Sequence, residues 1–436
     1  MKARIGIRRE VKSRWERRVP IVPDDARRVQ EEHGVEVWVE PSPIRVFPDE
    51  AYRSAGITVE DDLSPCPVIF GVKEMPAQSF DPGHTYVFFA HVIKGQPDNM
   101  GMLQRLLDLG CQLIDYERVT DERGRRLIFF GHHAGLAGMI DTLWALGQRL
   151  RSEGIVNPFV KLQQTYRYDD LAAAKAAVSA VGRRIAEEGL PESIRPLICG
   201  FAGYGNVFGG ANEIFELLPV EEIEPHEVED VAERSEAHPG VYKVVFKEQD
   251  TVEARASGGD FDLQDYYDCP AKYRSKFSTY LPHLTLLVNC VYWDEKYPRL
   301  VTKQDLRSLY GGSGQPRLRV IGDISCDIEG AIEATVKSTD PEDPLYVYDP
   351  FEDRAVDGVA GRGPVILAVD ILPSELPREA SLTFSSVLVD YAPAIAKADY
   401  SLPFEALDLP PEIRRAVIVH QGELTPDYGY LEKYLP

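Results

Sequence analysis

The chain has 436 residues, 44% of them hydrophobic, which is too long for one ordinary hydrophobic core. We therefore expect two compact domains of roughly 200 residues each. With 48 basic and 70 acidic residues the formal charge is −22, which argues against a nucleic-acid or anionic-membrane partner.

Six cysteines are scattered along the chain without a C-x-x-C pair, and several lie in apolar runs. This pattern is typical of reduced core thiols in a cytoplasmic protein. The amino terminus has no hydrophobic signal region, and no run approaches the roughly 18 apolar residues of a membrane span. We expect a cytoplasmic protein that makes no membrane contact.

Short apolar runs alternate with helix-like segments through the first part of the chain. The expected strands are residues 3–7, 35–39, 68–72, 86–90, 112–115 and 127–130. The expected helices are residues 24–32, 48–54 and 96–109. Such alternation favours a doubly wound, mostly parallel α/β sheet, so this part is a candidate domain by itself.

Ionisable residues stand where several of these strands would end. They are Glu16, Arg18, Lys73, Glu74, His91, Lys94 and Glu117. Because the carboxyl ends of parallel strands share one edge of a sheet, we expect these side chains to converge. Each one alone is more often a solvated or core side chain, but a lysine, a histidine and carboxylates together indicate a general acid–base site.

Residues 131–140 lead into a long helix that continues through Arg149 and is expected to cross between the domains. Its adjacent residues His132 and His133 do not share a helix face, and no further metal-ligand motif lies nearby, so we predict no metal site. The alanine-rich segment 171–188 is predicted to be a helix.

Residues 195–218 read in order as a buried strand, a glycine turn and an amphipathic helix, which is the arrangement that binds a dinucleotide pyrophosphate. Gly203 and Gly205 provide the tight turn, but Phe208 stands at the third-glycine position. The strand and helix around the turn nevertheless favour cofactor binding over a merely tight turn. The predicted contacts are Gly203, Gly205, Asn206 and Val207.

A second strand is expected at residues 220–224, and Glu224 at its end could hold the ribose hydroxyls or belong to an ordinary charged loop. Residues 227–259 are strongly charged and are expected to form surface connections. Further strands are expected at 280–293 and 317–324, and the latter ends in a polar run, residues 323–330, that holds the cofactor candidates Asp323 and Ser325. The proline-rich last hundred residues are expected to form irregular arms and short helices.

Ten short stretches, spread in one order along the whole chain, match motifs of a known family. They are residues 5–10, 15–18, 71–74, 89–94, 113–117, 203–207, 224–227, 292–293, 298–302 and 322–325. On these stretches the whole chain resembles the lysine–2-oxoglutarate reductase domain of the saccharopine pathway, with single-domain saccharopine dehydrogenases and alanine dehydrogenase as more distant relatives. So many motifs in one order are far more specific than the glycine loop alone.

The resemblance implies two Rossmann-like, doubly wound domains that close over an interdomain active-site cleft. Residues 1–132 and approximately 331–436 would form the substrate domain, with the carboxyl-terminal segment packing back on it, and residues 133–330 the dinucleotide-binding domain.

The resemblance also implies residue roles. Lys73 and His91 would be catalytic, and the substrates would be bound by Glu16, Arg18, Glu74, Lys94, Glu117 and Arg126. The reaction would be the reductive condensation of L-lysine with 2-oxoglutarate to saccharopine, which is reversible. The rivals are an opine-type dehydrogenase for another amine and 2-keto acid, and a catalytically silent nucleotide-binding homologue.

The residues fit this chemistry independently. Imine formation needs a neutral amine and proton transfer near neutrality, which a histidine and a lysine with a lowered pKa can provide. The substrate carboxylates need cations, for which Arg18, Lys94, Arg125 and Arg126 are candidates.

Cofactor choice is divided, because a carboxylate at Glu224 favours NAD(H) whereas the resemblance favours NADP(H). We weight NADP(H) slightly higher, because Arg234 or Lys243 could pair with the 2′-phosphate. The sequence leaves the oligomeric state open, a homodimer included.

Overall fold

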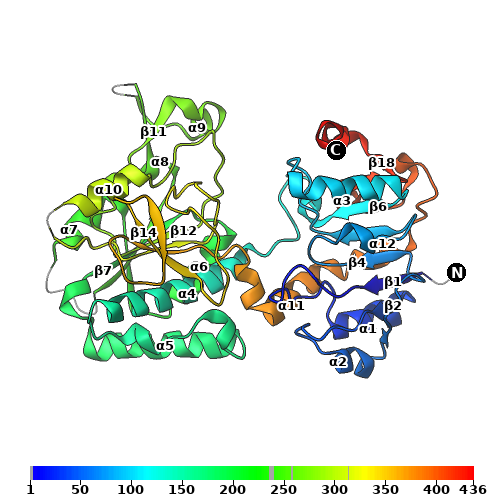
Figure 1. The fold of residues 1–436 in the computed structure, drawn as a ribbon, viewed down its shortest axis with the longest axis horizontal. Helices are drawn as coiled ribbons and strands as arrows, with labels where there is room; N and C mark the ends of the chain where they lie inside the picture. Colours follow the sequence, from blue (N-terminus) through cyan, green and yellow to red (C-terminus); the bar gives the residue numbers. More distant parts are fainter. Residues whose placement is uncertain (1–2, 235–239, 257–258, 313) are drawn as a thin grey trace. The chain divides into compact units, whose positions relative to one another are not determined.

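The computed structural model describes residues 3–234, 240–256, 259–312 and 314–436. These residues form two compact units (Figure 1). The first unit is Met1–Phe130 with Pro377–Pro436, and the second is Gly131–Leu376.

The first unit is built on a sheet of strand order β18-β17-β6-β5-β4-β1-β2-β3. Its strands are β1 (Arg4–Ile7), β2 (Glu36–Val39), β3 (Thr58–Val59), β4 (Val68–Phe70), β5 (Thr85–Phe88), β6 (Gln112–Asp115), β17 (Val417–His420) and β18 (Glu423–Leu424). Its helices are α1 (Pro23–His33), α2 (Asp49–Ser54), α3 (Pro97–Asp108), α11 (Pro377–Leu388), α12 (Ala392–Lys397) and α13 (Pro411–Arg414). The strands from β3 to β6 pair in parallel, and β4, β5 and β6 are wholly buried, as strands covered by helices on both faces must be.

The edge of this sheet corrects one expected strand. Residues 127–130 form no strand; Ile128 is buried, and its apolar neighbours Leu127 and Phe130 pack against the core. The place beside β6 is taken by β17, which pairs with it antiparallel. The expectation that the carboxyl-terminal segment packs back on the first domain is thereby confirmed.

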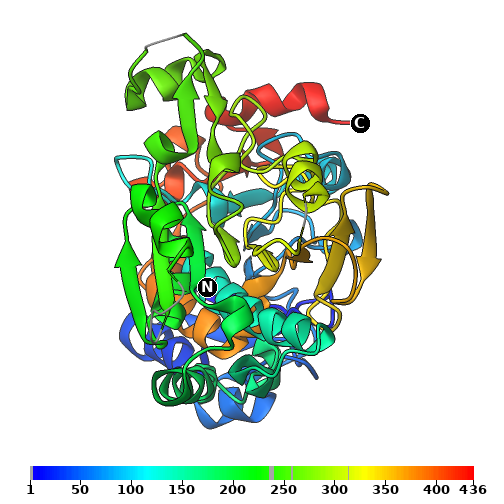
Figure 2. The same cartoon turned by 90° about the vertical axis from the view of Figure 1, so that its left-hand side faces the viewer.

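The second unit is built on a sheet of strand order β15-β14-β16-β13-β12-β7-β9-β8. Its strands are β7 (Leu197–Ala202), β8 (Val220–Ile223), β9 (Val241–Phe246), β12 (Leu286–Asn289), β13 (Val320–Asp323), β14 (Leu345–Asp349), β15 (Arg354–Asp357) and β16 (Val365–Leu367). Its helices are α4 (Gly131–Ser152), α5 (Leu171–Glu188), α6 (Asn206–Phe215), α7 (Val228–Ala232), α8 (Glu248–Thr251), α9 (Leu263–Asp268) and α10 (Lys303–Gly311). A small pair, β10 (Val252–Ala254) and β11 (Tyr273–Ser275), extends with α9 beyond the sheet (Figures 1 and 2).

Three expectations for this part of the chain are wrong. Residues 227–259 are not only surface connections, because β9 within them is a buried neighbour of β7. The last hundred residues supply β14, β15 and β16, which join the second sheet through β13. For that reason the second unit ends at Leu376 and not near residue 330, and α4 belongs to it entirely.

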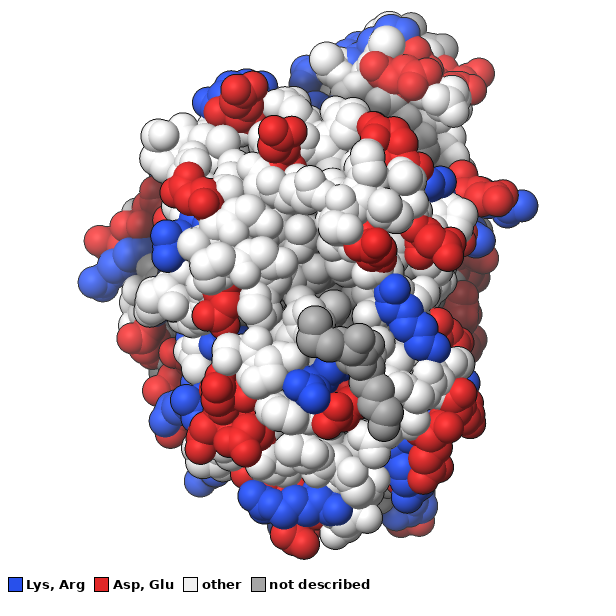
Figure 3. All heavy atoms as spheres, turned by 90° about the vertical axis from the view of Figure 1, so that its right-hand side faces the viewer, with Lys and Arg blue, Asp and Glu red and all other residues white. Residues whose placement is uncertain are grey.

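Charged side chains of both signs lie on the surface, and four of the six cysteines are buried. On the face shown in Figure 3, acidic and basic side chains are interspersed around a broad uncharged area. Of the free cysteines, Cys66, Cys111, Cys199 and Cys290 are buried, whereas Cys269 is exposed. None of the described helices combines the length and apolarity needed to cross a bilayer.

Candidate active site

Lys73 lies on the loop that follows β4 and is half-buried. Its backbone N–H and that of Val72 donate to the carboxylate of Glu10, at 3.1 and 2.7 Å. Burial, and then the positive charge of Arg18, lower the pKa of the Lys73 ammonium. A lysine in this setting can lose its proton at a pH where a free lysine cannot.

Glu10 is a site residue to which sequence reasoning gave no role, although it lies within the motif at residues 5–10. Burial, and then the charge of Glu16, raise the pKa of Glu10 to about 7. It follows β1, which is next to β4, so the strand order itself brings its carboxylate to the Lys73 loop.

Replacing Glu10 with glutamine should change how stability depends on pH. A carboxyl whose pKa is raised on folding stabilises the protein below its unfolded pKa, and this stabilisation is lost as pH rises through the folded value of about 7. We expect the Glu10→Gln variant to lose less free energy of unfolding between about pH 5 and 8, by the order of 1–3 kcal/mol. Urea titrations at the two pH values measure this; equal losses in both proteins would contradict the assignment.

His91 is held by Glu74 across the loops that follow β5 and β4. Nδ1 of His91 lies 2.8 Å from Oε1 of Glu74. Burial alone would raise the pKa of Glu74, but the hydrogen bond and charge of His91 and the charge of Lys73 lower it to about 2. Because an ionised carboxylate only accepts, Nδ1 carries the proton and Nε2 is the basic nitrogen of the neutral ring.

The backbone at His91 is in the left-handed region, with φ of 47°. Asn99 Nδ2 donates to the His91 carbonyl oxygen at 3.1 Å and helps to hold this conformation. A non-glycine residue in this region costs free energy, and such costs concentrate at functional sites.

Arg18 and Glu16 form a buried bidentate ion pair, with Nε donating to Oε1 at 2.7 Å. The Arg18 guanidinium also lies over the Phe130 ring, 4.2 Å from its centroid. From the sequence we expect Arg18 to bind substrate carboxylates through its positive charge. In the structure, however, the carboxylate of Glu16 already neutralises most of that charge. Its direct effect on the site is the lowered pKa of Lys73.

Three carboxylates near His91 each keep one buried oxygen without a hydrogen-bond partner among the described residues. These oxygens are Glu74 Oε2, Asp115 Oδ2 and Glu117 Oε2. Sequence reasoning missed Asp115, whose pKa burial raises to about 7 and whose titration responds to both Glu117 and His91. Buried acceptors in such a group are suited to an ammonium or amine donor.

The remaining predicted substrate residues, Arg126 and Lys94, are exposed. Arg126 is exposed and pairs with Glu117, while Arg125 pairs with Asp121 at 2.7 Å. Lys94 is exposed on the loop before α3, where Tyr430 donates to the neighbouring carbonyl oxygen of Ile93 at 2.6 Å.

The glycine loop of the second unit fits a dinucleotide pyrophosphate. Gly203 has φ of +92° directly after β7, and Gly205 is the N-cap of α6, with no side chain capping the helix. A Cβ at Gly205 would meet nothing described within 4 Å, so packing does not demand this glycine and the space is open to a ligand. Asn206 is exposed and Val207 half-buried at the first turn, where backbone N–H groups favour an anion.

In an ordinary fingerprint the third glycine allows close packing of the helix. Here other glycines provide that packing. Phe208 packs edge-on against Phe201 of β7. Gly210 and Gly135 instead let α6 and α4 touch, because a Cβ at either position would lie about 2 Å from a backbone oxygen of the other helix.

The other predicted cofactor residues differ in their surroundings. Glu224 is exposed after β8, and its backbone N–H donates to Glu227 at 2.9 Å. Asp323 is buried and accepts from Asn289 at 2.8 Å and from Thr335, so it stabilises the ends of β12 and β13. Ser325 Oγ donates to the Val291 carbonyl oxygen at 2.6 Å.

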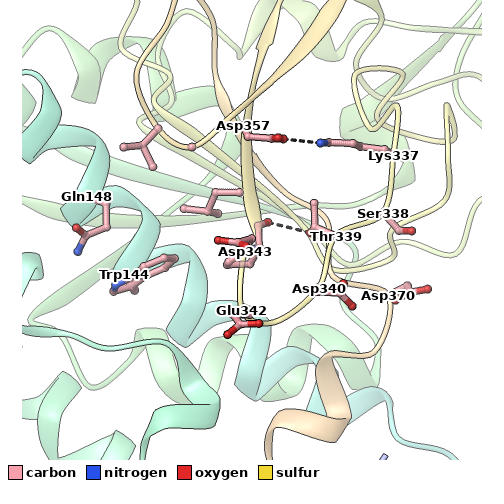
Figure 4. Close-up of a pocket in the computed structure, with 14 residues that line it drawn as sticks. Trp144, Gln148, Lys337, Ser338, Thr339, Asp340, Glu342, Asp343, Asp357 and Asp370 are labelled. Carbon is pink, nitrogen blue, oxygen red and sulfur yellow. Dashed lines mark hydrogen bonds and ion pairs between the residues drawn. The ribbon is translucent and has the colours of Figure 1, made fainter. Parts of the chain in front are cut away.

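A separate pocket of about 750 Å³ lies in the second unit between α4 and the segments around β14 and β15 (Figure 4). It is lined by Trp144 and Gln148 of α4 and by polar residues of 337–343, and Lys337 pairs with Asp357. None of the catalytic, substrate-binding or cofactor-binding residues predicted from the sequence lines this pocket.

Comparison with known families decides the relationship. Residues 6–137 match "Alanine dehydrogenase/PNT, N-terminal domain" and residues 249–427 match "Alanine dehydrogenase/PNT, C-terminal domain". The chain belongs to the alanine dehydrogenase/PNT family. The family's dehydrogenases imply a nicotinamide cofactor, and the resemblance inferred from the motifs is confirmed.

Named relatives refine this picture. The α-aminoadipic semialdehyde synthase of Arabidopsis thaliana is 37% identical over 98% of this chain, and the mitochondrial one of Bos taurus 36% identical over 99%. The chain spans only 41% and 48% of those two proteins. The saccharopine dehydrogenase (NAD⁺, L-lysine-forming) of Yarrowia lipolytica is 26% identical over 88% of this chain and 90% of its own length.

Solved structures confirm the two-domain α/β fold. An L-alanine dehydrogenase superposes with a TM-score of 0.64 at 18% identity, covering 99% of this chain and all of that one. A transhydrogenase from Sinorhizobium meliloti superposes with a TM-score of 0.54 at 15% identity, covering 97% and 99%.

Proposed function

We propose that the chain joins the ε-amine of L-lysine to 2-oxoglutarate by reductive condensation, giving saccharopine reversibly. The observation that carries this proposal is that Lys73, whose pKa is lowered, and His91 both interact with the carboxylate of Glu74. It is supported by the similarity to α-aminoadipic semialdehyde synthases along nearly the whole chain.

The first steps need proton transfer. The lysine ε-nitrogen must be neutral to attack the 2-oxo carbon, and Lys73 as a free base would take its proton. The resulting carbinolamine loses its oxygen as water once that oxygen is protonated. We assign the donation of this proton to His91 in its protonated form. Each group therefore acts on a different proton of one reaction.

The imine carbon then accepts a hydride, which a bound reduced nicotinamide would supply as it is oxidised, and the nitrogen keeps one proton as the secondary amine. In the second unit, backbone N–H groups after Gly205 would hold the pyrophosphate. The interdomain cleft implied by the resemblance stays a prediction, as do a cytoplasmic location and a homodimer.

The charges of the site residues indicate which groups would bind the amine and which would bind the substrate carboxylates. The unpartnered oxygens of Glu74, Asp115 and Glu117 would accept from the amine, and Arg126 and Lys94 would face the carboxylates of 2-oxoglutarate. Arg18 would act mainly through the pKa of Lys73 because its pair with Glu16 is fully buried, whereas Arg126 stays exposed although it pairs with Glu117.

Replacing Arg126 with methionine should raise the KM for 2-oxoglutarate by about tenfold or more with a smaller change in kcat, because a carboxylate contact is lost in ground and transition states alike. Steady-state kinetics measure this. Arg123→Met, which removes an exposed cation from the same turn, is the matched control. An equal change in both variants would remove Arg126 from the binding site.

For the cofactor, the resemblance favours NADPH and the residues favour NADH. Lys243, one of two cations that could have met a 2′-phosphate, is buried on β9 and paired with Glu216 and Glu222, both at 2.9 Å. The other, Arg234, is exposed after α7. We give the residues more weight and propose NADH as the preferred cofactor.

The test is to mix pure protein with NADH or NADPH and a panel of amines and 2-keto acids, and to follow the oxidation of the reduced nicotinamide by absorbance. We expect turnover with lysine and 2-oxoglutarate. Turnover with another pair alone would favour an opine-type dehydrogenase, and dinucleotide binding without any turnover would favour a silent homologue.

A further inference from the structure

The order of strands beside the glycine loop differs from that of an ordinary dinucleotide-binding sheet. There, the strand that follows the glycine loop in sequence lies next to the loop's own strand, and an acidic residue near its end holds the ribose hydroxyls. Here β9, not β8, pairs with β7 along its whole length, and β8 pairs with the far side of β9. Strand spacing then puts the end of β8 roughly 10 Å from that of β7, twice the distance for β9.

The carboxylate next to the glycine loop is that of Glu248, two residues after β9. Tyr204, which stands between Gly203 and Gly205, donates its hydroxyl to Glu248 Oε2 at 3.0 Å. Tyr267 of α9 donates to Oε1 at 2.7 Å, and α8 and α9 lie next to one another (Figure 1). The two tyrosines fix the Glu248 side chain, whose backbone starts α8, against the loop that would carry the pyrophosphate.

We propose that Glu248, not Glu224, is the carboxylate beside the adenosine ribose, and that it sets the preference between NADH and NADPH. The inference rests on the proposed function only in requiring that the glycine loop bind a nicotinamide dinucleotide.

The chemistry of Glu248 suits this role. A carboxylate can accept about four hydrogen bonds, so two tyrosine hydroxyls leave capacity for the ribose 2′- and 3′-hydroxyls. A 2′-phosphate in the same place would add a like charge beside a carboxylate that is already partly desolvated. Lys243 points its charge at Glu216 and Glu222, which leaves exposed Lys247 as the neighbouring cation of this strand end.

Equilibrium binding of NADH and of NADPH, followed by nicotinamide fluorescence, tests the proposal without substrates. In Glu248→Gln the affinity for NADPH relative to NADH should rise by about tenfold or more, since a repulsive charge is removed while the amide can still accept. Glu253→Gln, which removes a half-exposed carboxylate of β10 paired with Arg274, is the matched control and should leave the ratio within about twofold.

The outcomes separate the inference from the proposed function. If both nucleotides bind but the ratio moves in Glu224→Gln or Lys247→Gln and not in Glu248→Gln, the inference is wrong and the dinucleotide site stands. If neither nucleotide binds the wild-type protein, both the inference and the proposed function are wrong. A melting curve for each variant confirms that it is folded.

Discussion

Replacing Lys73 with methionine is expected to lower kcat by roughly 10²–10⁴-fold and to remove one limb of the pH–rate profile. The reason is that Lys73 is held near Glu10 and Arg18, where burial and a neighbouring cation lower its pKa so that it can take a proton from the substrate amine. Affinity for the nicotinamide cofactor should barely change, because the glycine loop lies in the other unit.

The stability of the Lys73→Met protein should not fall together with its kcat. A lysine whose pKa is lowered on folding carries its full charge-burial cost below the folded pKa, and the cost disappears only as pH rises toward the ordinary value of 10.5. Methionine removes this cost, so the Lys73→Met protein should melt no lower than wild type at neutral pH. A variant that keeps its kcat but melts earlier would show that Lys73 only holds the loop.

Lys73→Arg separates proton transfer from simple charge. A guanidinium keeps the positive charge but does not deprotonate in proteins. If Lys73 acts as a base, the arginine variant should be nearly as slow as the methionine variant. Recovery of most of the activity with arginine would assign Lys73 an electrostatic role.

Replacing Gly210 with alanine is expected to destabilise the second unit by about 3 kcal/mol, far more than a methyl group normally costs. A Cβ there would lie 2.0 Å from the His132 carbonyl oxygen and 2.8 Å from the Leu136 nitrogen, both backbone atoms of α4. The helices would have to separate, and α6 carries the glycine loop at its start, so dinucleotide affinity should fall as well.

Gly209→Ala is the matched control on the same helix. Its Cβ would meet only the His132 ring nitrogen, at 3.8 Å. Since alanine favours a helix over glycine, this variant should be neutral or more stable by up to about 1 kcal/mol. Denaturant unfolding of the two variants compares them directly, and similar free energies of unfolding would contradict the close helix contact.

The sequence predicted best those parts whose signal is local. The bounds of β6 and α5 agree with their predicted ranges because each is a short apolar or alanine-rich run between clear breaks. β9 was missed because charged segments flank it and because Lys243 lies within it. Only the fold shows that Glu216 and Glu222 neutralise that lysine.

The candidate site was predictable to the extent that it depends on strand ends. Lys73, Glu74 and His91 come together because β4 and β5 are neighbours in a parallel sheet. Glu10 and Asp115 were missed because a buried carboxylate of raised pKa looks like any other charge in a sequence. The pairing of β14 with β16, and of β17 with β6, joins segments whose relation no local pattern encodes.

The central claim is that the ε-nitrogen of lysine is joined to the 2-oxo carbon of 2-oxoglutarate. The most direct measurement is mass spectrometry of the product formed from lysine labelled with ¹⁵N at the ε position, 2-oxoglutarate and reduced nicotinamide dinucleotide in which both hydrogens at C4 are deuterium. We predict one product that retains the lysine carbon skeleton, the labelled nitrogen as a secondary amine, and one deuterium on the carbon that was the ketone. Labelled glutamate, or a product joined through the unlabelled α-nitrogen, would contradict the account.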